Sequence, residues 1–273
     1  MNRKKRIRDS NVEMLSKLAQ NGKTIFTVED AIEVSNYSPE MLRLTLHNLK
    51  KSKWIDRIER GKYIIIPLEA GPEGLYTEHE FIIASFLVDP YTISYWSALN
   101  FHEFTEQIPR TVYVSTTRKK EKREKEVFGI KYKFIVLKET KFFGITKTWI
   151  GNKQINVTDK EKTILDCLDH PEYCGGIIEA AKGLWEGRED LNPEKISHYA
   201  ERMGNVTIFK RLGFLSELLE IPWKKFYQEK WKEGISKGYP LLDPKMPKKG
   251  EYNTKWKLRI NVEKQELTGW RVH

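Results

Sequence analysis

The spacing of hydrophobic residues changes from helical to alternating within one short stretch near the start of the chain. Leu42, Leu46 and Leu49 recur at positions i, i+4 and i+7, which predicts one buried stripe along a helix. Ser38 is a favoured N-cap residue, and the proline after it suits the first helical position. Beyond this helix apolar and polar positions alternate, and Gly61 is placed to turn the chain. The pattern therefore predicts a helix that runs directly into a two-stranded hairpin.

Two shorter helices are predicted ahead of that helix. Residues 10–20 have helical spacing and end before Gly22, a common helix terminator. The apolar face predicted for this helix consists of Val12, Leu15, Leu18 and Ala19. Residues 24–26 suit a short strand that pairs with the hairpin, and Thr27 is a favoured N-cap for a second helix over residues 28–34. Three helices and a hairpin within about 60 residues outline a winged helix-turn-helix, a DNA-binding module.

The rest of the chain mixes strands and helices. Residues 69–76 contain glycine and proline and are predicted to be a linker, which separates domains at residues 1–68 and 77–273. Strands are expected within residues 111–115, 130–137, 142–156 and 255–262, and most helices between residues 158 and 235. The charge run at residues 118–126 is expected to be a solvated loop or helix face. The predicted fold class is α+β, with the winged helix-turn-helix followed by a larger mixed C-terminal domain.

A helix start is predicted at Thr158. Thr158 and Glu161 have the spacing of a capping box, in which the two side chains satisfy backbone N–H groups at the start of a helix. The apolar residues Ile164, Leu165 and Leu168 follow at helical spacing. We therefore expect both residues to have a structural role.

Composition narrows the class of protein. No apolar run approaches the roughly 20 residues that a membrane span needs, and the N-terminal charges are not followed by the apolar segment of a secretory signal. We therefore expect a cytoplasmic protein with no membrane contact. Cys167 and Cys174 are too few for a disulfide scaffold, and no second Cys or His pair completes a zinc site. We expect no metal, and no cofactor because neither a P-loop nor a G-x-G-x-x-G motif occurs.

The charge balance favours a polyanionic partner. The net charge is +10, and residues 1–68 contain 14 Lys+Arg against 8 Asp+Glu. Charged residues make up 32% of the chain, a usage that is also typical of thermophile proteins. The excess in the first domain coincides with the predicted DNA-binding module, so we expect double-stranded DNA as the partner.

Basic and polar side chains of the first domain are predicted to contact this DNA. The N-terminal arm would reach phosphates or an adjacent minor groove. Polar side chains of the third helix suit base edges, whereas the lysines after it and on the hairpin suit phosphates. The predicted set is Arg3, Lys4, Lys5, Arg6, Ser38, Arg43, Thr45, His47, Lys50, Lys51, Lys53, Arg60 and Lys62. A winged helix also serves protein contacts, so an adaptor protein is an alternative.

A metal-dependent DNA nuclease is the alternative from a different class. Glu139 and Lys141 follow an apolar strand and match the E-x-K end of a nuclease motif, which also needs a second carboxylate around the metal. Asp89, the nearest upstream aspartate, is far back in the chain, so we predict no catalytic residues and no enzymatic activity.

Aromatic residues near the C-terminus offer one more candidate surface. Trp223, Trp231 and Trp256 alternate with lysines, as in proteins that stack single-stranded bases, but their helical spacing favours a place in the core. The basic segment 245–259 is a further candidate for nucleic-acid contact.

Several segments together resemble AbiEi-type transcriptional regulators, the antitoxins of type IV toxin–antitoxin systems. The segments SYWSALNFHEFTEQIPRTVYVSTT (94–117) and VTDKEKTILDCLDHPEYCGG (157–176) are similar to two sequence blocks of that family. IERGKYIIIP (58–67) is similar to its wing, and the segments LLDPKMP and KWKLRINV to its C-terminal end. The matching positions of the two blocks include Ser97, His102, Gln107, Thr158, Glu161 and Asp166. Glu103 stands where the family usually has glycine.

The resemblance implies an N-terminal winged helix that binds the operator of its own operon and acts as an autoregulating repressor. It also implies a C-terminal α+β domain without catalytic activity, which supports antitoxin function and cooperative binding, as a homodimer or on DNA. The expected functional partner is a nucleotidyltransferase-like toxin that forms no stable complex with the antitoxin. The sequence assigns no role to His102 or Asp166.

Overall fold

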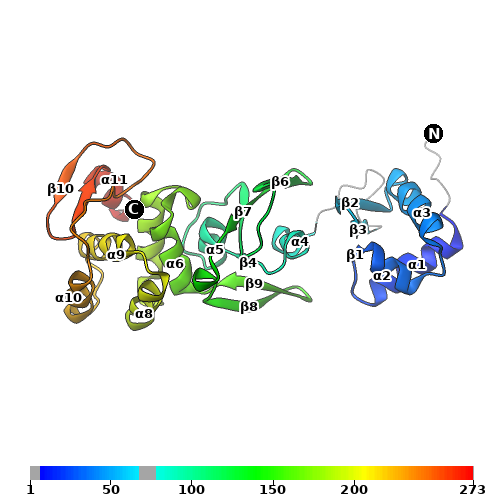
Figure 1. Cartoon of the computed structure of the whole chain (residues 1–273), viewed down its shortest axis with the longest axis horizontal. Helices are drawn as coiled ribbons and strands as arrows, with labels where there is room; N and C mark the ends of the chain where they lie inside the picture. Colours follow the sequence, from blue (N-terminus) through cyan, green and yellow to red (C-terminus); the bar gives the residue numbers. More distant parts are fainter. Residues whose placement is uncertain (1–6, 68–77, 273) are drawn as a thin grey trace. The chain divides into compact units, whose positions relative to one another are not determined.

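The computed structural model describes residues 7–67 and 78–272. The chain divides into two units, Met1–Leu87 and Val88–His273, and each combines helices with β-strands (Figure 1). The predicted mixed α+β class is therefore confirmed. The arm residues Arg3, Lys4, Lys5 and Arg6 and the predicted linker 69–76 lie outside the described residues. None of the helices within the described ranges is long and apolar enough to cross a membrane.

The first unit contains the predicted helices and hairpin. Its elements are α1 (Asp9–Gln20), β1 (Ile25–Thr27), α2 (Val28–Val34), α3 (Pro39–Lys51), β2 (Ile55–Glu59), β3 (Lys62–Ile65) and α4 (Glu80–Leu87). Within residues 7–67, β1, β3 and β2 form a three-stranded antiparallel sheet in that order, with Ile25 opposite Ile64 and Ile55 opposite Ile65. Gly61 has φ +77°, a conformation that glycine adopts without strain, and joins β2 to β3.

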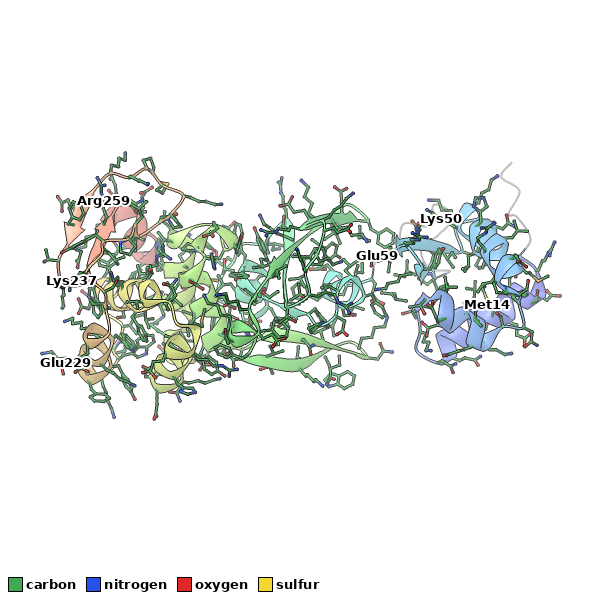
Figure 2. All side chains as sticks on the ribbon, in the orientation of Figure 1. Met14, Lys50, Glu59, Glu229, Lys237 and Arg259 are labelled. Carbon is green, nitrogen blue, oxygen red and sulfur yellow. The ribbon has the colours of Figure 1, made fainter. Side chains whose placement is uncertain are left out.

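One face of α1 differs from the prediction. Met14, Leu15 and Leu18 are buried, whereas Val12 is 42% exposed and Ala19 is also exposed. Met14 lies inside the first unit, and Lys50 is at its surface (Figure 2). Met14 belongs to the buried stripe in place of Val12 and Ala19, so the stripe is rotated around the helix relative to the prediction.

The starts of α2 and α3 agree with the predicted caps. The Oγ1 of Thr27 accepts a hydrogen bond from the Asp30 N–H at 3.1 Å, and Asp30 Oδ2 accepts one from the Thr27 N–H at 2.7 Å. This reciprocal capping box satisfies two backbone donors. At α3, Ser38 Oγ accepts from the Met41 N–H at 3.3 Å, with Pro39 in the first helical position. Both predicted N-caps are therefore confirmed.

The second unit is a sheet followed by a helical region. Its elements are β4 (Thr92–Ile93), α5 (Tyr95–Phe101), β5 (Thr111–Thr116), β6 (Glu124–Val127), β7 (Ile130–Val136), β8 (Ile145–Ile150), β9 (Lys153–Thr158), α6 (Lys160–Asp169), α7 (Ile177–Glu186), α8 (Pro193–Met203), α9 (Val206–Leu218), α10 (Lys225–Glu233), β10 (Glu251–Asn253), β11 (Leu258–Ile260) and α11 (Lys264–Thr268). Within residues 78–272, six strands form a mixed sheet in the order β6-β7-β5-β4-β9-β8. The helix α6, buried from Glu161 to Asp169, contacts α5, α7, α8 and α9 (Figure 1).

The end of the charge run 118–126 is a strand, contrary to the expectation of a loop or helix. Residues 124–127 form β6, which pairs antiparallel with β7 at the end of the sheet. Glu124 Oε1 lies 3.3 Å from Lys133 Nζ on the neighbouring strand. Alternating charges are tolerated there because an edge strand keeps its side chains in water, and they oppose unwanted pairing with other chains.

The predicted capping box of Thr158 and Glu161 is wrong. The N-cap of α6 is Asp159, whose Oδ1 accepts a hydrogen bond from the Lys162 N–H at 2.9 Å. Thr158 is the last residue of β9, and its buried hydroxyl lies 2.8 Å from the hydroxyl of Thr163. Glu161 instead accepts hydrogen bonds from Asn192 N at 3.1 Å and Lys195 Nζ at 2.7 Å. The strand expected within residues 142–156 extends two residues further, to Thr158, so the helix starts one position later than predicted.

The same junction explains His102, the C-cap of α5. Its Nε2–H donates to the Thr158 carbonyl at 2.7 Å, and burial lowers the pKa of its ring although this hydrogen bond opposes the shift. The bond connects the end of α5 to the end of β9. His102 is therefore a structural tether between the two segments 94–117 and 157–176.

Asp166 is part of a buried ion pair on α6. Lys162 and Asp166, one turn apart, are 1% and 2% exposed, and the Lys162 ammonium donates to Asp166 Oδ1. Burial raises the pKa of Asp166 although Lys162 opposes this shift. The second carboxylate oxygen has no hydrogen-bond partner in the described part of the chain. Removal of either partner would leave an unpaired charge in the core.

Candidate nucleic-acid interface

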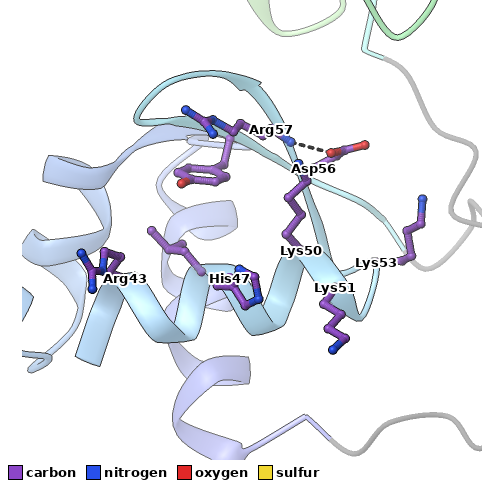
Figure 3. Close-up of a pocket in the computed structure, with 9 residues that line it drawn as sticks. Arg43, His47, Lys50, Lys51, Lys53, Asp56 and Arg57 are labelled. Carbon is purple, nitrogen blue, oxygen red and sulfur yellow. Dashed lines mark hydrogen bonds between the residues drawn. The ribbon is translucent and has the colours of Figure 1, made fainter. Parts of the chain in front are cut away.

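A groove of about 640 Å³ lies between α3 and the β2–β3 hairpin of the first unit (Figure 3). It is lined by Arg43, Leu46, His47, Lys50, Lys51, Lys53, Asp56, Arg57 and Tyr63. Five of these side chains are cationic and one is acidic, so the lining carries a strong positive charge. A concave basic surface beside an exposed helix is suited to a polyanion.

The rotation of α3 about its axis determines which of its side chains line the groove. Leu42, Leu46 and Leu49 are at most 3% exposed and anchor one face of the helix in the core. Arg43 and His47 are exposed on the neighbouring rows, because residues four apart share a face. Along the same helix, the Lys50 side chain rises toward the hairpin, whereas Lys51 points away from it (Figure 3).

The C-terminal capping motif of α3 places Lys53 in the groove lining. It has φ +62°, the left-handed conformation that usually favours glycine after a helix. The Lys53 N–H donates to the Lys50 carbonyl and the Trp54 N–H to the Leu49 carbonyl, both at 3.0 Å. These two bonds form a Schellman motif, and Trp54 packs against the core that contains Leu49. A cationic residue therefore occupies a position where glycine would fit with less strain.

The hairpin supplies three lining residues that the sequence did not identify, Asp56, Arg57 and Tyr63. Arg57 and Tyr63 lie opposite each other on β2 and β3, and Tyr63 stacks on Phe26 with ring centroids 5.8 Å apart. Asp56 Oδ1 accepts from the Arg57 N–H at 2.7 Å, and Arg57 Nε donates to the Glu59 carbonyl at 3.2 Å. Arg57 is exposed, and its position beside α3 depends on the packing of the sheet.

Four predicted DNA-binding residues are not in the groove lining. Ser38 is exposed and uses its hydroxyl as the cap of α3. Thr45 is half-buried, and at about 100° per residue it lies roughly 160° around the helix from His47. Arg60 is exposed in the turn before Gly61. The Lys62 ammonium is already bound, because it donates to the Phe86 carbonyl and lies 3.6 Å from Glu59 Oε2.

An ion-pair network supports the start of α2. Lys23 Nζ lies 2.5 Å from Asp30 Oδ1 and 3.3 Å from Glu33 Oε2. Burial alone would raise the pKa of Asp30, but its hydrogen bonds from Lys23 and Thr27 outweigh burial and hold the pKa below its usual value. The carboxylate thus stays charged at the positive end of the helix dipole, which stabilises α2.

The nuclease alternative receives no support from the second unit. Lys141 Nζ is 2.7 Å from Asp169 Oδ2, so it is part of an ion pair, and Glu139 is exposed at the start of a short 3-10 turn. Residues 7–67 and 78–272 contain no group of three or more His, Cys, Asp or Glu placed to hold a metal ion. Cys167 and Cys174 are buried free thiols.

The C-terminal tryptophans are core residues. Trp231 and Trp256 are 1% and 0% exposed, and Trp256 Nε1 donates to Glu217 Oε2 at 2.9 Å. This confirms the interpretation of their spacing as core packing. In the basic segment 245–259, Lys255 is paired with Glu217 at 2.6 Å, and contact of this segment with nucleic acid stays a prediction.

Comparison with known proteins connects the groove to a family. Residues 13–66, which contain the whole groove lining, match a family model described as "Transcriptional regulator, AbiEi antitoxin". The crystal structure of the RV2827C protein from Mycobacterium tuberculosis is similar over 98% of this chain and 96% of that one, with a TM-score of 0.69 and 12% identity. At this identity the likeness shows a shared fold alone. Comparison with curated proteins gives no match.

Proposed function

We propose, from the match of residues 13–66 to a transcriptional-regulator family, that this protein is a sequence-specific repressor that binds double-stranded operator DNA. In this proposal residues 1–68 are a winged helix-turn-helix, residues 69–76 a linker, and residues 77–273 a regulatory domain without catalytic activity. The helix α3 enters the major groove and the β2–β3 hairpin is the wing. The single observation that carries the proposal is the cationic groove between these two elements.

The positions of the charged side chains support separate roles for them in this groove, with some contacting base edges and others contacting phosphates. Arg43 and His47 lie on the exposed part of α3, where side chains meet base edges. Lys50, Lys53 and Arg57 lie on the side toward the hairpin, where they suit the phosphates that flank the major groove. The N-terminal arm with Arg3 to Arg6 would add phosphate or minor-groove contacts. Arg60, at the tip of the wing, would meet the next phosphates along the duplex.

We also propose that the protein acts in the cytoplasm as the autoregulating antitoxin of a type IV toxin–antitoxin system. The functional partner would be a nucleotidyltransferase-like toxin that is opposed without a stable complex. Binding at the operator would be cooperative or involve a homodimer. The support for this finer role is the family description, because antitoxins of this kind combine transcriptional regulation with toxin neutralisation.

Fluorescence anisotropy with a labelled duplex from upstream of the gene tests DNA binding. We expect affinity to fall steeply with salt, and Lys50→Ala to reduce the slope of log K against log[salt] by about 0.9, the value for one phosphate contact. Lys147→Ala, which removes an exposed lysine from β8 in the second unit, is the matched control. It should change neither the affinity nor the slope of log K against log[salt]. Absence of salt-dependent binding to any duplex would favour an adaptor protein instead.

Two further experiments separate the remaining alternatives. Plasmid incubated with the protein and Mg²⁺ or Mn²⁺ should stay intact, whereas cutting that is lost in Glu139→Ala would establish the nuclease. Co-expression with the adjacent gene tests the antitoxin role. If that gene encodes a nucleotidyltransferase that arrests growth, the full chain should restore growth; continued arrest would restrict the protein to transcriptional regulation.

A further inference from the structure

A stripe of exposed side chains runs along α3 on the side away from the core. Glu40, Leu44, His47 and Lys51 follow one another at spacings of four, three and four residues and are all exposed. At about 100° per residue, Leu44 lies roughly 140–160° around the helix from each of the three buried leucines. Leu44 is therefore near the centre of the face that would point into a major groove.

Leu44 is 62% exposed, more than any other large hydrophobic residue in the described part of the first unit. A single exposed leucine is common on protein surfaces, so a functional role for Leu44 has to be argued from the residues around it. Glu40, one turn earlier, would be repelled by phosphates, and a leucine gains nothing from them. Lys50, Lys53 and Arg57, which suit phosphates, lie beside this stripe and toward the hairpin, whereas His47 and Lys51 belong to both the stripe and the groove lining. This stripe is thus suited to base edges, with phosphate contacts beside it.

We propose that Leu44 is a specificity-determining residue that contacts the C5-methyl group of a thymine in the operator; this inference rests on the proposed function. In the major groove the thymine methyl is the apolar feature of the base-pair edges, and an aliphatic side chain is its matching partner. The cationic lining beside Leu44 makes duplex DNA the occupant with complementary charge. A thymine methyl therefore buries against the isobutyl group of Leu44 when α3 is seated.

Deoxyuridine scanning with the full chain tests this contact. The preferred duplex is first selected from random sequence with the wild-type protein. Each thymine is then replaced singly by deoxyuridine, which removes one methyl group and keeps the base pairing. We expect at least one position where the wild-type protein loses about fourfold in affinity, the value of one buried methyl group. Leu44→Ala should bind the thymine duplex about fourfold more weakly and show no further loss at that position.

Met41→Ala is the matched control, because Met41 is 54% exposed on the same helix but lies about 60° around it from Leu44, on the side away from Arg43 and Lys50. This variant should keep the sensitivity to deoxyuridine at that position. Since Leu44 and Met41 are exposed, neither substitution should change the circular dichroism or thermal unfolding of the protein.

The remaining outcomes distinguish a failure of this inference from a failure of the proposed function. Absence of salt-dependent duplex binding by the wild-type protein overturns both. Specific binding with a flat deoxyuridine scan, or a methyl sensitivity that survives in Leu44→Ala, overturns only the role of Leu44. A sedimentation experiment in which Leu44→Ala dissociates a wild-type dimer would identify the residue as a protein contact and would also overturn the inference.

Discussion

Replacement of Lys53 by glycine should stabilise the first unit while it weakens DNA binding. Lys53 holds φ +62° in the Schellman motif that ends α3, and only glycine adopts this conformation without strain. Relief of the left-handed conformation is worth about 1–2 kcal/mol, and the extra freedom of glycine in the unfolded chain returns about 0.5–1 kcal/mol. The net expectation is a gain of about 0.5–1 kcal/mol in the free energy of unfolding.

Amide hydrogen exchange of the full chain measures this gain locally, because core amides of a unit exchange through its unfolding. A gain of about 0.5–1 kcal/mol corresponds to roughly two- to fivefold slower exchange in the peptides that contain Leu42, Leu46 and Leu49. The lost ammonium should at the same time lower duplex affinity and reduce the salt slope by about 0.9.

Lys53→Ala is the control for the lysine position, since it removes the same charge but leaves a side chain with the left-handed strain. It should weaken DNA binding as much as Lys53→Gly and should not slow exchange. If amide exchange of the core peptides is unchanged or faster in Lys53→Gly, the left-handed conformation of Lys53 does not destabilise the first unit. Unchanged DNA affinity in both variants would remove Lys53 from the interface.

The structure leads to four other predictions. Arg43→Ala should relax sequence preference at one position by about 1–3 kcal/mol, measured on single-base variants of the preferred duplex; an equal loss on all duplexes would assign Arg43 to phosphate contact. Thr27→Ala should destabilise the first unit by about 1 kcal/mol in hydrogen exchange. The lowered pKa of Asp30 in the folded state means that its stabilising effect is present above the unfolded pKa and is lost as pH falls through the folded value. Asp30→Asn should therefore flatten the acid dependence of exchange, and an unchanged profile would contradict this. In urea unfolding of the second unit, Lys162→Met should cost about 3–5 kcal/mol because Asp166 stays buried without its ion-pair partner, and the added change Asp166→Leu should recover most of it.

Features of the candidate site that depend on neighbouring residues were predictable from the sequence. The buried stripe of Leu42, Leu46 and Leu49 follows from the helical repeat alone, and the caps at Thr27 and Ser38 need only the backbone N–H groups two or three residues ahead. These contacts form within one element, so their geometry is the same in any protein. The resemblance to AbiEi-type regulators agrees with the match over residues 13–66.

Other features needed contacts between elements that are distant in the sequence. The place of Arg57 beside α3 follows from the pairing and packing of the hairpin, and Lys62 is engaged because the Phe86 carbonyl is within its reach. In the second unit, the N-cap of α6 is Asp159 and not Thr158, because β9 extends to Thr158 and pairs this residue with Ile145.

In the first unit the sequence by itself therefore determined which helices and strands form and which face and cations of α3 are exposed, because these depend on contacts over one or two turns. The tertiary structure alone decided that Arg57 joins these cations in the groove and which polar side chains are already bound inside the protein. The physical reason is that a hydrogen bond or ion pair occupies a side chain, and its partner is known only when the chain has brought distant residues together.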